Sequence, residues 1–449
     1  MDRELIDVEH LNIALTDEER DTLRGEHGAT LQKIMETVVR YAEALGADRL
    51  VDIEGPGHFV IPWASPGIAP PLEMLDELAE AGLETTHPFT LDPCSPLDFE
   101  PLDLTEAQQQ LVLEMYRDQV MYDRRLLQLG LRDRDAYTCN PYVPEVGNAP
   151  EQGTILAWSE SACAVFANSV LGARTNRNGA IMDLLCNIVG KTPLTGLLTD
   201  EGRRATRLVR IDTAELPHPQ LLGAALGRLV LADVPYIVGL DRFLGPGLND
   251  ATRDYLQEMG AGCATYGAVG LYHVENITPE AVAQGRDLLD PESTTHVIDD
   301  RVLNELMSSF PKMWSIEGAR PERCFIGCPH LSLKQMNWWS ERIHRALQTC
   351  GRNRLVVDTL ICTAPGVLEK FQSDVDAYNR LIDAGVKLGV TCVETLFEGG
   401  VIGDAKVVTN STKLRAYAPA VFFPDDELLE IMVSGRIGAG TTPSGEAGS

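Results

Sequence analysis

Three cysteines stand in settings that are richer in turns and polar residues than the rest of the chain. Cys139 lies in YTCNPYVPEVGN, Cys328 in IGCPHLSL and Cys392 in GVTCVETL, and each closes or follows a strand-like run. Iron–sulfur clusters need soft thiolate ligands, and thiolates at strand-to-loop transitions can converge although they are far apart in sequence. Such wide spacings form no motif, so two interpretations stay open: three cluster ligands that leave one iron open to substrate, or three buried, small hydrophobic side chains.

A second candidate is the stretch SESACAVFANSVLGARTNRNG, residues 159–179, which places polar groups between apolar ones. A helix over 162–171 would bury its apolar face and leave donors and acceptors around both ends. Two arginines within four residues can clamp a carboxylate, although a buried helix fixed by an Arg–carboxylate network would look the same. The candidate residues of this stretch are Ser159, Glu160, Asn168, Ser169, Arg174, Thr175, Asn176 and Arg177.

Three further positions could add to such a pocket. Lys191 in VGKTP could supply positive charge, or could be an ordinary solvated lysine. His273 ends the strand-like run YGAVGLYHVE beside Glu275, which suits a proton relay, although a lone histidine at a strand end is more commonly structural. The segment TNSTK offers Asn410, Ser411 and Lys413 to a carboxylate, or forms an ordinary turn or helix cap.

The elements that must position these residues are predicted to be α/β. Periodicity predicts helices over 17–46, 72–81 and 105–130, with an irregular loop over 55–71. A short strand-like run lies at 50–53 in the N-terminal part. Beyond residue 150, strand-like runs such as 228–239, 269–274, 323–327 and 354–359 alternate with helical stretches. This alternation favours parallel α/β layers. Composition shifts predict domains over 1–150, 151–290 and 291–435, and a flexible tail over 436–449.

Composition excludes several classes of function. Lys and Arg number 38 against 66 Asp and Glu, and the net charge of -28 repels phosphate backbones and anionic lipids, so neither nucleic acid nor membrane is an expected partner. The start, MDRELIDVEH, lacks the features of a signal peptide, and the ten cysteines are scattered, which predicts a cytoplasmic protein with reduced thiols. The absence of GxGxxG, GxxxxGK[ST], HExxH and GxSxG weakens nucleotide-binding, zinc-protease and serine-hydrolase hypotheses.

Taken together, these segments resemble one family, the aconitase X proteins, from about Leu15 to about Arg415. The most specific signature is FANSVLGARTNRNG, and CNPY, VGKTP, YGAVGLYHVENITPE, IGCPH, TC and TNSTK follow the family order. The resemblance implies an aconitase-like arrangement of three α/β domains around a central iron–sulfur cluster. It also implies that Cys139, Cys328 and Cys392 hold that cluster, whether [2Fe-2S], [3Fe-4S] or [4Fe-4S].

The resemblance further implies a dehydratase of a small hydroxy carboxylate. Cis-3-hydroxy-L-proline is the expected substrate, with a phosphomevalonate-like or specialised hydroxy acid as the alternative. The residues predicted to be catalytic are Ser159, Glu160, Lys191 and His273. The residues predicted to bind the substrate are Asn168, Ser169, Arg174, Thr175, Asn176, Arg177, Asn410, Ser411 and Lys413.

Two departures from the family pattern qualify this expectation. The small swivelling domain, whose serine-rich loop supplies the catalytic base in the family, is absent from this sequence, which predicts a separate small subunit. The stretch 54–101 differs from the family's HIDG pattern, with His58 as a loose counterpart, so the substrate could differ. A non-catalytic cluster-binding subunit and a zinc-dependent lyase that uses the same thiols are the competing hypotheses.

Overall fold

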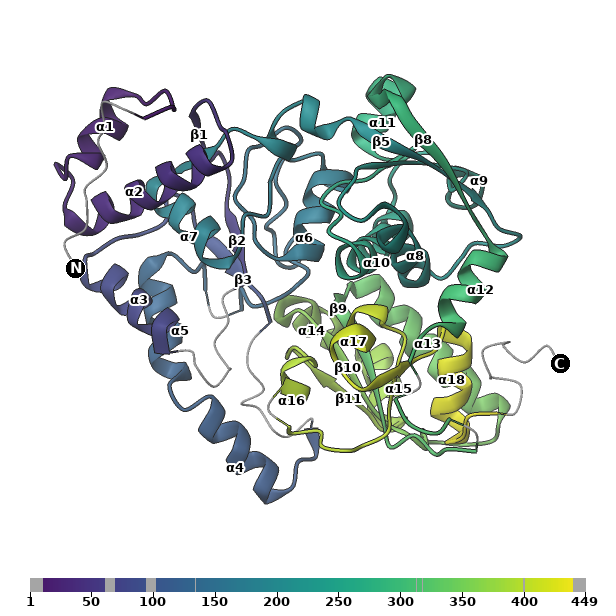
Figure 1. The fold of residues 1–449 in the computed structure, drawn as a ribbon. Coiled ribbons are helices and arrows are strands. Elements are labelled where there is room, and N and C mark those ends of the chain that lie inside the picture. The colour runs from purple at the N-terminus through teal and green to yellow at the C-terminus, as the bar shows by residue number, and fades with distance from the viewer. Residues whose placement is uncertain are drawn as a thin grey trace.

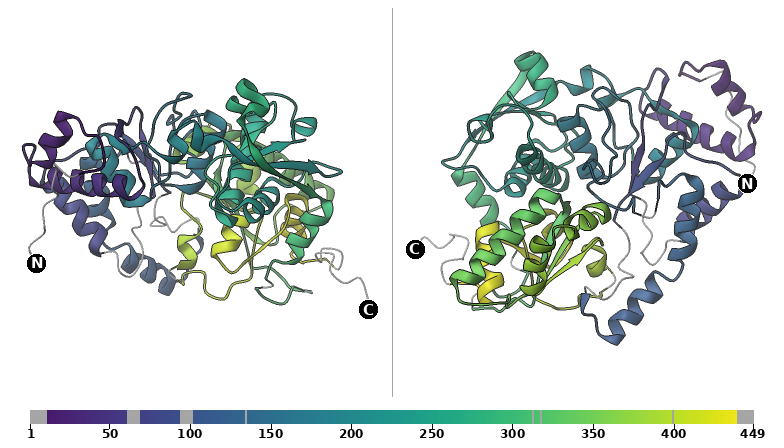
Figure 2. Two further views of the ribbon diagram at one scale, coloured as in Figure 1. Left: turned by 45° about the horizontal axis from the view of Figure 1, so that its top comes forward. Right: turned by 180° about the vertical axis from the view of Figure 1, so that it is seen from behind.

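The computed structural model describes residues 11–60, 69–93, 102–133, 135–311, 313–316, 318–398 and 400–438. Most of the predicted tail, and residues 61–68 of the predicted loop, lie outside these ranges. Three lobes surround the middle of the molecule in Figure 1, and the views in Figure 2 show the same grouping. Each lobe has its own buried hydrophobic cluster.

The N-terminal lobe carries helices around two small sheets. Its helices are α1 (Asp17–Leu23), α2 (Ala29–Ala44), α3 (Ala69–Glu80), α5 (Gln119–Leu129) and α7 (Ala180–Val189). Helix α4 (Glu106–Met115) instead packs its buried Val112 in one cluster with residues of the C-terminal lobe. Strand β1 (Leu50–Asp52) pairs antiparallel with β4 (Lys191–Pro193), and β2 (Gly57–Phe59) pairs parallel with β3 (Phe89–Leu91). The prediction of one helix over 17–46 is wrong, because Gly25 and Gly28 adopt φ of 84° and 100° between α1 and α2. The helix predicted over 105–130 is likewise two helices, α4 and α5.

The middle lobe is built on a parallel four-stranded sheet in the order β7-β6-β5-β8. Its strands are β5 (Ala205–Asp212), β6 (Pro235–Val238), β7 (His273–Val274) and β8 (Leu289–Asp299). Its helices are α6 (Ser161–Phe166), α8 (Pro219–Val230), α9 (Asp241–Leu244), α10 (Asp250–Tyr266), α11 (Pro279–Gln284) and α12 (Asp300–Ser308). Helices α8 and α10 touch closely, since a Cβ added at Gly223 would stand 2.1 Å from the Met259 carbonyl oxygen. The strand predicted over 228–239 is wrong in its first part, which ends α8.

The C-terminal lobe holds a parallel five-stranded sheet in the order β11-β10-β9-β12-β13. Its strands are β9 (Arg323–Leu331), β10 (Asp358–Thr363), β11 (Val386–Gly389), β12 (Val407–Thr409) and β13 (Ala420–Phe422). Its helices are α13 (Leu333–Thr349), α14 (Pro365–Gln372), α15 (Val375–Asp383), α16 (Thr395–Glu398), α17 (Thr412–Tyr417) and α18 (Asp425–Ser434). The two parallel sheets confirm the predicted α/β fold. Loops at the carboxyl ends of parallel strands commonly build ligand sites, and the TNSTK segment follows β12 in this position.

Among the helices within the described ranges, none combines the length and the apolar character needed to cross a membrane.

The buried carboxyl of Asp183 in α7 predicts a pH-dependent stability. Asn178 Nδ2 and the Gly179 N–H donate to it at 2.9 and 3.2 Å, but burial raises its pKa to about 7. In the unfolded chain it titrates near pH 4, so between about pH 4 and 7 the folded protein holds a proton that the unfolded chain has lost. The free energy of unfolding therefore falls as pH rises through this window.

The variant Asp183→Asn is expected to flatten this fall by up to about 1.4 kcal/mol per pH unit. Urea unfolding of both proteins at several pH values between 4 and 8 measures the two slopes. Equal slopes would show that Asp183 titrates normally in the folded protein.

Candidate functional site

The three predicted ligand cysteines are the partly exposed thiols of the interior. Cys139, Cys328 and Cys392 are intermediate in exposure, whereas Cys163, Cys186, Cys263, Cys324 and Cys362 are buried. Burial raises the pKa of Cys139 and Cys392, and the neighbouring Cys328 raises both further. Cys139 also raises the pKa of Cys392. The structure thus places the three thiols near enough to one another to interact electrostatically.

His330 joins the segments that carry two of these thiols. Its backbone N–H donates to Cys139 Sγ at 3.2 Å, and its ring Nδ1 lies 3.1 Å from the Thr138 hydroxyl. Asn140 Nδ2 donates to the His330 carbonyl at 3.1 Å. Burial lowers the pKa of His330 to about 4, so the ring is neutral near pH 7. These bonds fix the loop of Cys139 against the end of β9, which contains Cys328.

The donor set fits a cluster better than a single ion. Within the described residues, no group of three or more His, Cys, Asp or Glu side chains is placed to hold a metal ion. In a [3Fe-4S] or [4Fe-4S] cluster each thiolate binds a different iron, so the thiols surround a volume and need not meet at one point. Lys413 lowers the pKa of Cys139 and Cys328 against the larger effect of burial, and a Ser411 hydrogen bond also lowers that of Cys328. Lys413 thus favours the thiolate form, which binds iron, at two of the three cysteines, although burial keeps the pKa of each thiol above its ordinary value.

A buried ion pair lies beside the thiols. Lys413 Nζ lies 2.8 Å from Glu160 Oε1, with side-chain exposures of 13% and 4%. Glu160 also caps α6, because its carboxylate accepts the Cys163 N–H at 2.6 Å. Burial disfavours the charge of Glu160, but Lys413 and this N–H overcome it and lower the pKa to about 2. The pair joins two predicted site segments that are 253 residues apart.

Sequence reasoning missed a second polar pair next to this one. His58 Nδ1 lies 2.9 Å from the Thr90 hydroxyl, and its Nε2 lies 3.9 Å from Asp92 Oδ1. Among the described residues, neither of these two facing atoms has a hydrogen-bond partner, and both are buried. Burial lowers the pKa of His58 to about 4 and raises that of Asp92 well above its ordinary value.

Ser159 ties this pair to Glu160, its neighbour in sequence. Its N–H donates to the His58 carbonyl at 3.0 Å, and its hydroxyl accepts the Val60 N–H at 2.9 Å. Glu160 and Lys413 both act on the pKa of Asp92. We define the site group as the three thiols, Glu160 with Lys413, His58 with Asp92, Ser159 and Ser411.

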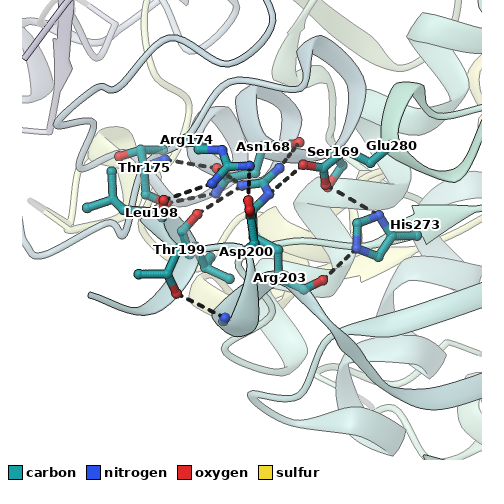
Figure 3. A network of polar contacts seen from close by, with 12 residues as sticks. Asn168, Ser169, Arg174, Thr175, Leu198, Thr199, Asp200, Arg203, His273 and Glu280 are labelled. Atoms are coloured by element: carbon teal, nitrogen blue, oxygen red, sulfur yellow. Dashed lines mark hydrogen bonds and ion pairs between the residues drawn. The ribbon is translucent and has the colours of Figure 1, made fainter. Parts of the chain in front are cut away.

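Several predicted residues instead join a buried network around Arg203, drawn in Figure 3. Asn168 lies in a π-helical turn (Ala167–Leu171), and its amide donates to the carbonyls of Thr175 and Gly270 and accepts the Thr175 N–H. Arg203 donates to Asn168 and pairs with Glu280 at 2.8 Å. His273 Nε2 lies 2.8 Å from the Arg203 carbonyl. The Ser169 hydroxyl accepts the Tyr272 N–H.

The remaining predicted residues also bond within the chain. Arg174 donates to the Leu198 carbonyl and pairs with Asp200 at 2.5 Å (Figure 3), and Asn176 bonds the backbone of Thr195 and Leu197. Lys191 pairs with Asp52, Asn410 donates to Asp425, and Arg177 has a left-handed φ of 57°. None of these contacts reaches the site group. Their predicted roles in binding and catalysis remain predictions.

Arg203 is expected to be a large contributor to stability. Its side chain is 2% exposed, and its loss would leave the Glu280 carboxyl in the interior without its guanidinium partner, with only the His273 ring 3.7 Å away. Removing one partner of a buried ion pair costs about 3–5 kcal/mol, so Arg203→Met should lower the free energy of unfolding by about this amount.

The matched control is Arg301→Met, which breaks the exposed Arg301–Glu305 pair. Exposed pairs contribute at most about 1 kcal/mol, so this variant should unfold almost as the parent does in urea. Equal losses in the two variants would contradict the structural role of the network.

Comparisons with known proteins match most of the chain. A family model described as "Aconitase X first domain" matches residues 12–201, and one described as "Aconitase X second domain" matches residues 205–308. The chain is 33% identical to the phosphomevalonate dehydratase large subunit of Thermococcus kodakarensis, over 89% of this chain and 90% of that protein. It is 29% identical to the cis-3-hydroxy-L-proline dehydratase of Pseudomonas aeruginosa, over 89% of this chain but 65% of that protein.

A solved structure shows the same fold. The chain superposes on the holo-form of Thermococcus kodakaraensis aconitase X with a TM-score of 0.73 and 30% identity, over 93% of this chain and 99% of that one.

Proposed function

Because the chain belongs to the aconitase X family, we propose that it is the large subunit of a hydro-lyase that removes water from a small hydroxy carboxylate. The observation that carries this proposal is the Glu160–Lys413 ion pair, buried beside three thiols that fit an iron–sulfur cluster. A scaffold subunit would gain nothing from two desolvated charges and a facing pair of unbonded polar atoms at this position.

The thiols of Cys139, Cys328 and Cys392 would hold the cluster, whose nuclearity follows from its iron and sulfide content. When bound, the cluster supplies a Lewis acid for the departing hydroxyl group. Lys413, held protonated by Glu160 and the thiols, would bind the substrate carboxylate. This contact would orient the carbon that loses its proton.

The other residues of the site group have distinct parts. Glu160 stays ionised and holds Lys413 in place, and can accept a hydrogen bond from a substrate ammonium. His58 is neutral and Asp92 favours its protonated form, so the two can donate hydrogen bonds without adding charge. Ser159 fixes the His58 segment. His58 and Glu160, with pKa values of about 4 and about 2, are weak general bases near pH 7, and we assign the general base to the partner subunit.

Cis-3-hydroxy-L-proline is the substrate that the geometry favours. Its ammonium and carboxylate groups match the two opposite charges of the Glu160–Lys413 pair. Phosphomevalonate is favoured by the comparisons, because the chain aligns with almost the full length of a subunit named for that substrate. Phosphomevalonate has a phosphate in addition to its carboxylate, and Lys413 offers one cation, so the second subunit would have to supply more positive charge.

A separate small subunit completes the proposed enzyme. The Thermococcus relative is named a large subunit, and the chain spans 65% of the Pseudomonas dehydratase. We infer that the missing part of that protein corresponds to the partner of this chain.

The test is an anaerobic turnover assay of the two-subunit complex with each substrate. Formation of the alkene or its tautomer from cis-3-hydroxy-L-proline supports the geometric assignment, and turnover of phosphomevalonate alone moves the substrate to the second candidate. Turnover of neither by a complex that contains a full cluster would contradict both substrate assignments.

A further inference from the structure

A cavity of about 520 Å³ lies against the loop that carries Cys139. It is lined by Asn140 and residues 142–145 of this loop, by Phe166 of α6, and by the N-terminal turns of α10 and α13. The thiols, Glu160 and Lys413 are not among its lining residues. A cavity of this size holds a small molecule, and it is separate from the site group.

Two buried polar atoms of the cavity wall lack a partner. Asn140 is 0% exposed and Tyr142 is 9% exposed, and both line the cavity. Within the described residues, neither Asn140 Oδ1 nor the Tyr142 hydroxyl has a hydrogen-bond partner. The Tyr142 ring stacks on Phe166 at 3.8 Å, which fixes the direction of its hydroxyl. Leaving a buried polar group unbonded costs about 1–3 kcal/mol, so a ligand that bonds to these atoms would recover that energy.

Rotation of the Asn140 side-chain amide would not give its Oδ1 a hydrogen-bond donor. Its Nδ2 already donates to the His330 carbonyl at 3.1 Å and lies 3.4 Å from Gln257 Oε1. The free atom is therefore an acceptor and requires a donor. An ammonium or hydroxyl group meets this requirement.

Charged side chains of both signs line the cavity: Glu145, Asp250 and Asp254 are acidic, and Arg253 and Lys334 are basic. Asp254 is partly buried beside Ser332, and burial raises the pKa of its carboxyl to about 6. A carboxyl with this pKa is mostly ionised near pH 7 and can pair with a cation. Lys334 is exposed in the first turn of α13, and Arg253 is half-buried in the first turn of α10. The N-terminus of α13, a helix of 17 residues, adds a preference for negative charge on that side.

We propose that this cavity binds a small zwitterion of the α-amino-acid class. The ammonium group points inward to Asn140 Oδ1 and Asp254, and the carboxylate points outward to Arg253 and Lys334. The Tyr142 hydroxyl can donate to or accept from the ligand. This proposal does not depend on the proposed dehydration, because the cavity shares no residue with the site group.

The test measures binding of three matched probes to the purified full chain by calorimetry: L-alanine, ethylamine and propionate. L-Alanine is expected to bind saturably, and the probes that lack one charged group are expected to bind at least about tenfold more weakly, since each loses one charge-assisted contact. Absence of saturable L-alanine binding would overturn the proposal, as would equal binding of all three probes.

Two variants locate the bound molecule. Asp254→Asn should weaken the binding of L-alanine and of ethylamine. Asp376→Asn, at an exposed position, is its matched control. Lys334→Gln should weaken the binding of L-alanine but not that of ethylamine. Lys334 is exposed, so its replacement should not disturb folding. Binding of L-alanine that is unchanged in both Asp254→Asn and Lys334→Gln would place the site elsewhere and contradict the proposal.

Discussion

Cys328→Ser is expected to remove most of the bound iron and to lower dehydratase turnover by about a thousandfold. A hydroxyl is a poor replacement for a soft thiolate, so one of three cluster ligands is lost. Lewis-acid assistance by a metal is worth several kcal/mol, and each 1.36 kcal/mol corresponds to tenfold in rate. The measurement is iron and sulfide content together with turnover of the complex.

The matched control is Cys350→Ser, because Cys350 is exposed and lies outside the site group. It should keep both its iron and its activity. The same loss is expected for Cys139→Ser and Cys392→Ser. Full iron content in any of these three variants would exclude that cysteine as a ligand.

Lys413→Met is expected to damage both stability and function. It leaves Glu160 ionised and buried without its partner, which costs about 3–5 kcal/mol of unfolding free energy. It also removes the cation that we assign to the substrate carboxylate, so KM should rise. The measurements are urea unfolding and steady-state kinetics. Lys33→Met, in the exposed Lys33–Glu77 pair, is the stability control.

The double variant Glu160→Gln with Lys413→Met separates the two effects. Removal of both charges should recover much of the lost stability, because no buried charge remains unpaired. Activity should stay low, since the carboxylate contact is still missing. A double variant that regains activity together with stability would show that Lys413 has a structural role only.

The fold class followed from the sequence because it depends on local pattern. Short apolar runs alternating with helical periods predicted parallel layers, and the two parallel sheets confirm them. Helix ends were less predictable. Gly25 and Gly28 interrupt a helical pattern that continues on both sides, and periodicity alone does not register the positive φ that ends α1.

Polar groups beside unusual cysteines or turns drew attention to Glu160 and Lys413 in the sequence, and the structure places the two in contact. His58 was noted only as a loose counterpart of a family histidine, and Asp92 was not noted. Their proximity depends on the parallel pairing of β2 and β3, which the sequence does not reveal. The type and spacing of Arg174 predict a clamp for an external carboxylate, and this role stays a prediction. In the structure its guanidinium pairs with Asp200, which lies 26 residues later and which spacing within the motif does not reveal.

The most direct test of the central claim is a titration of the cluster-loaded chain with its small subunit while turnover of a hydroxy carboxylate is followed. We predict no turnover by either subunit alone and a rate that rises and saturates near equimolar small subunit. Full turnover by this chain alone would contradict the assignment of the base to the partner. An equimolar complex that binds no iron would contradict the assignment of this chain as the cluster-binding subunit.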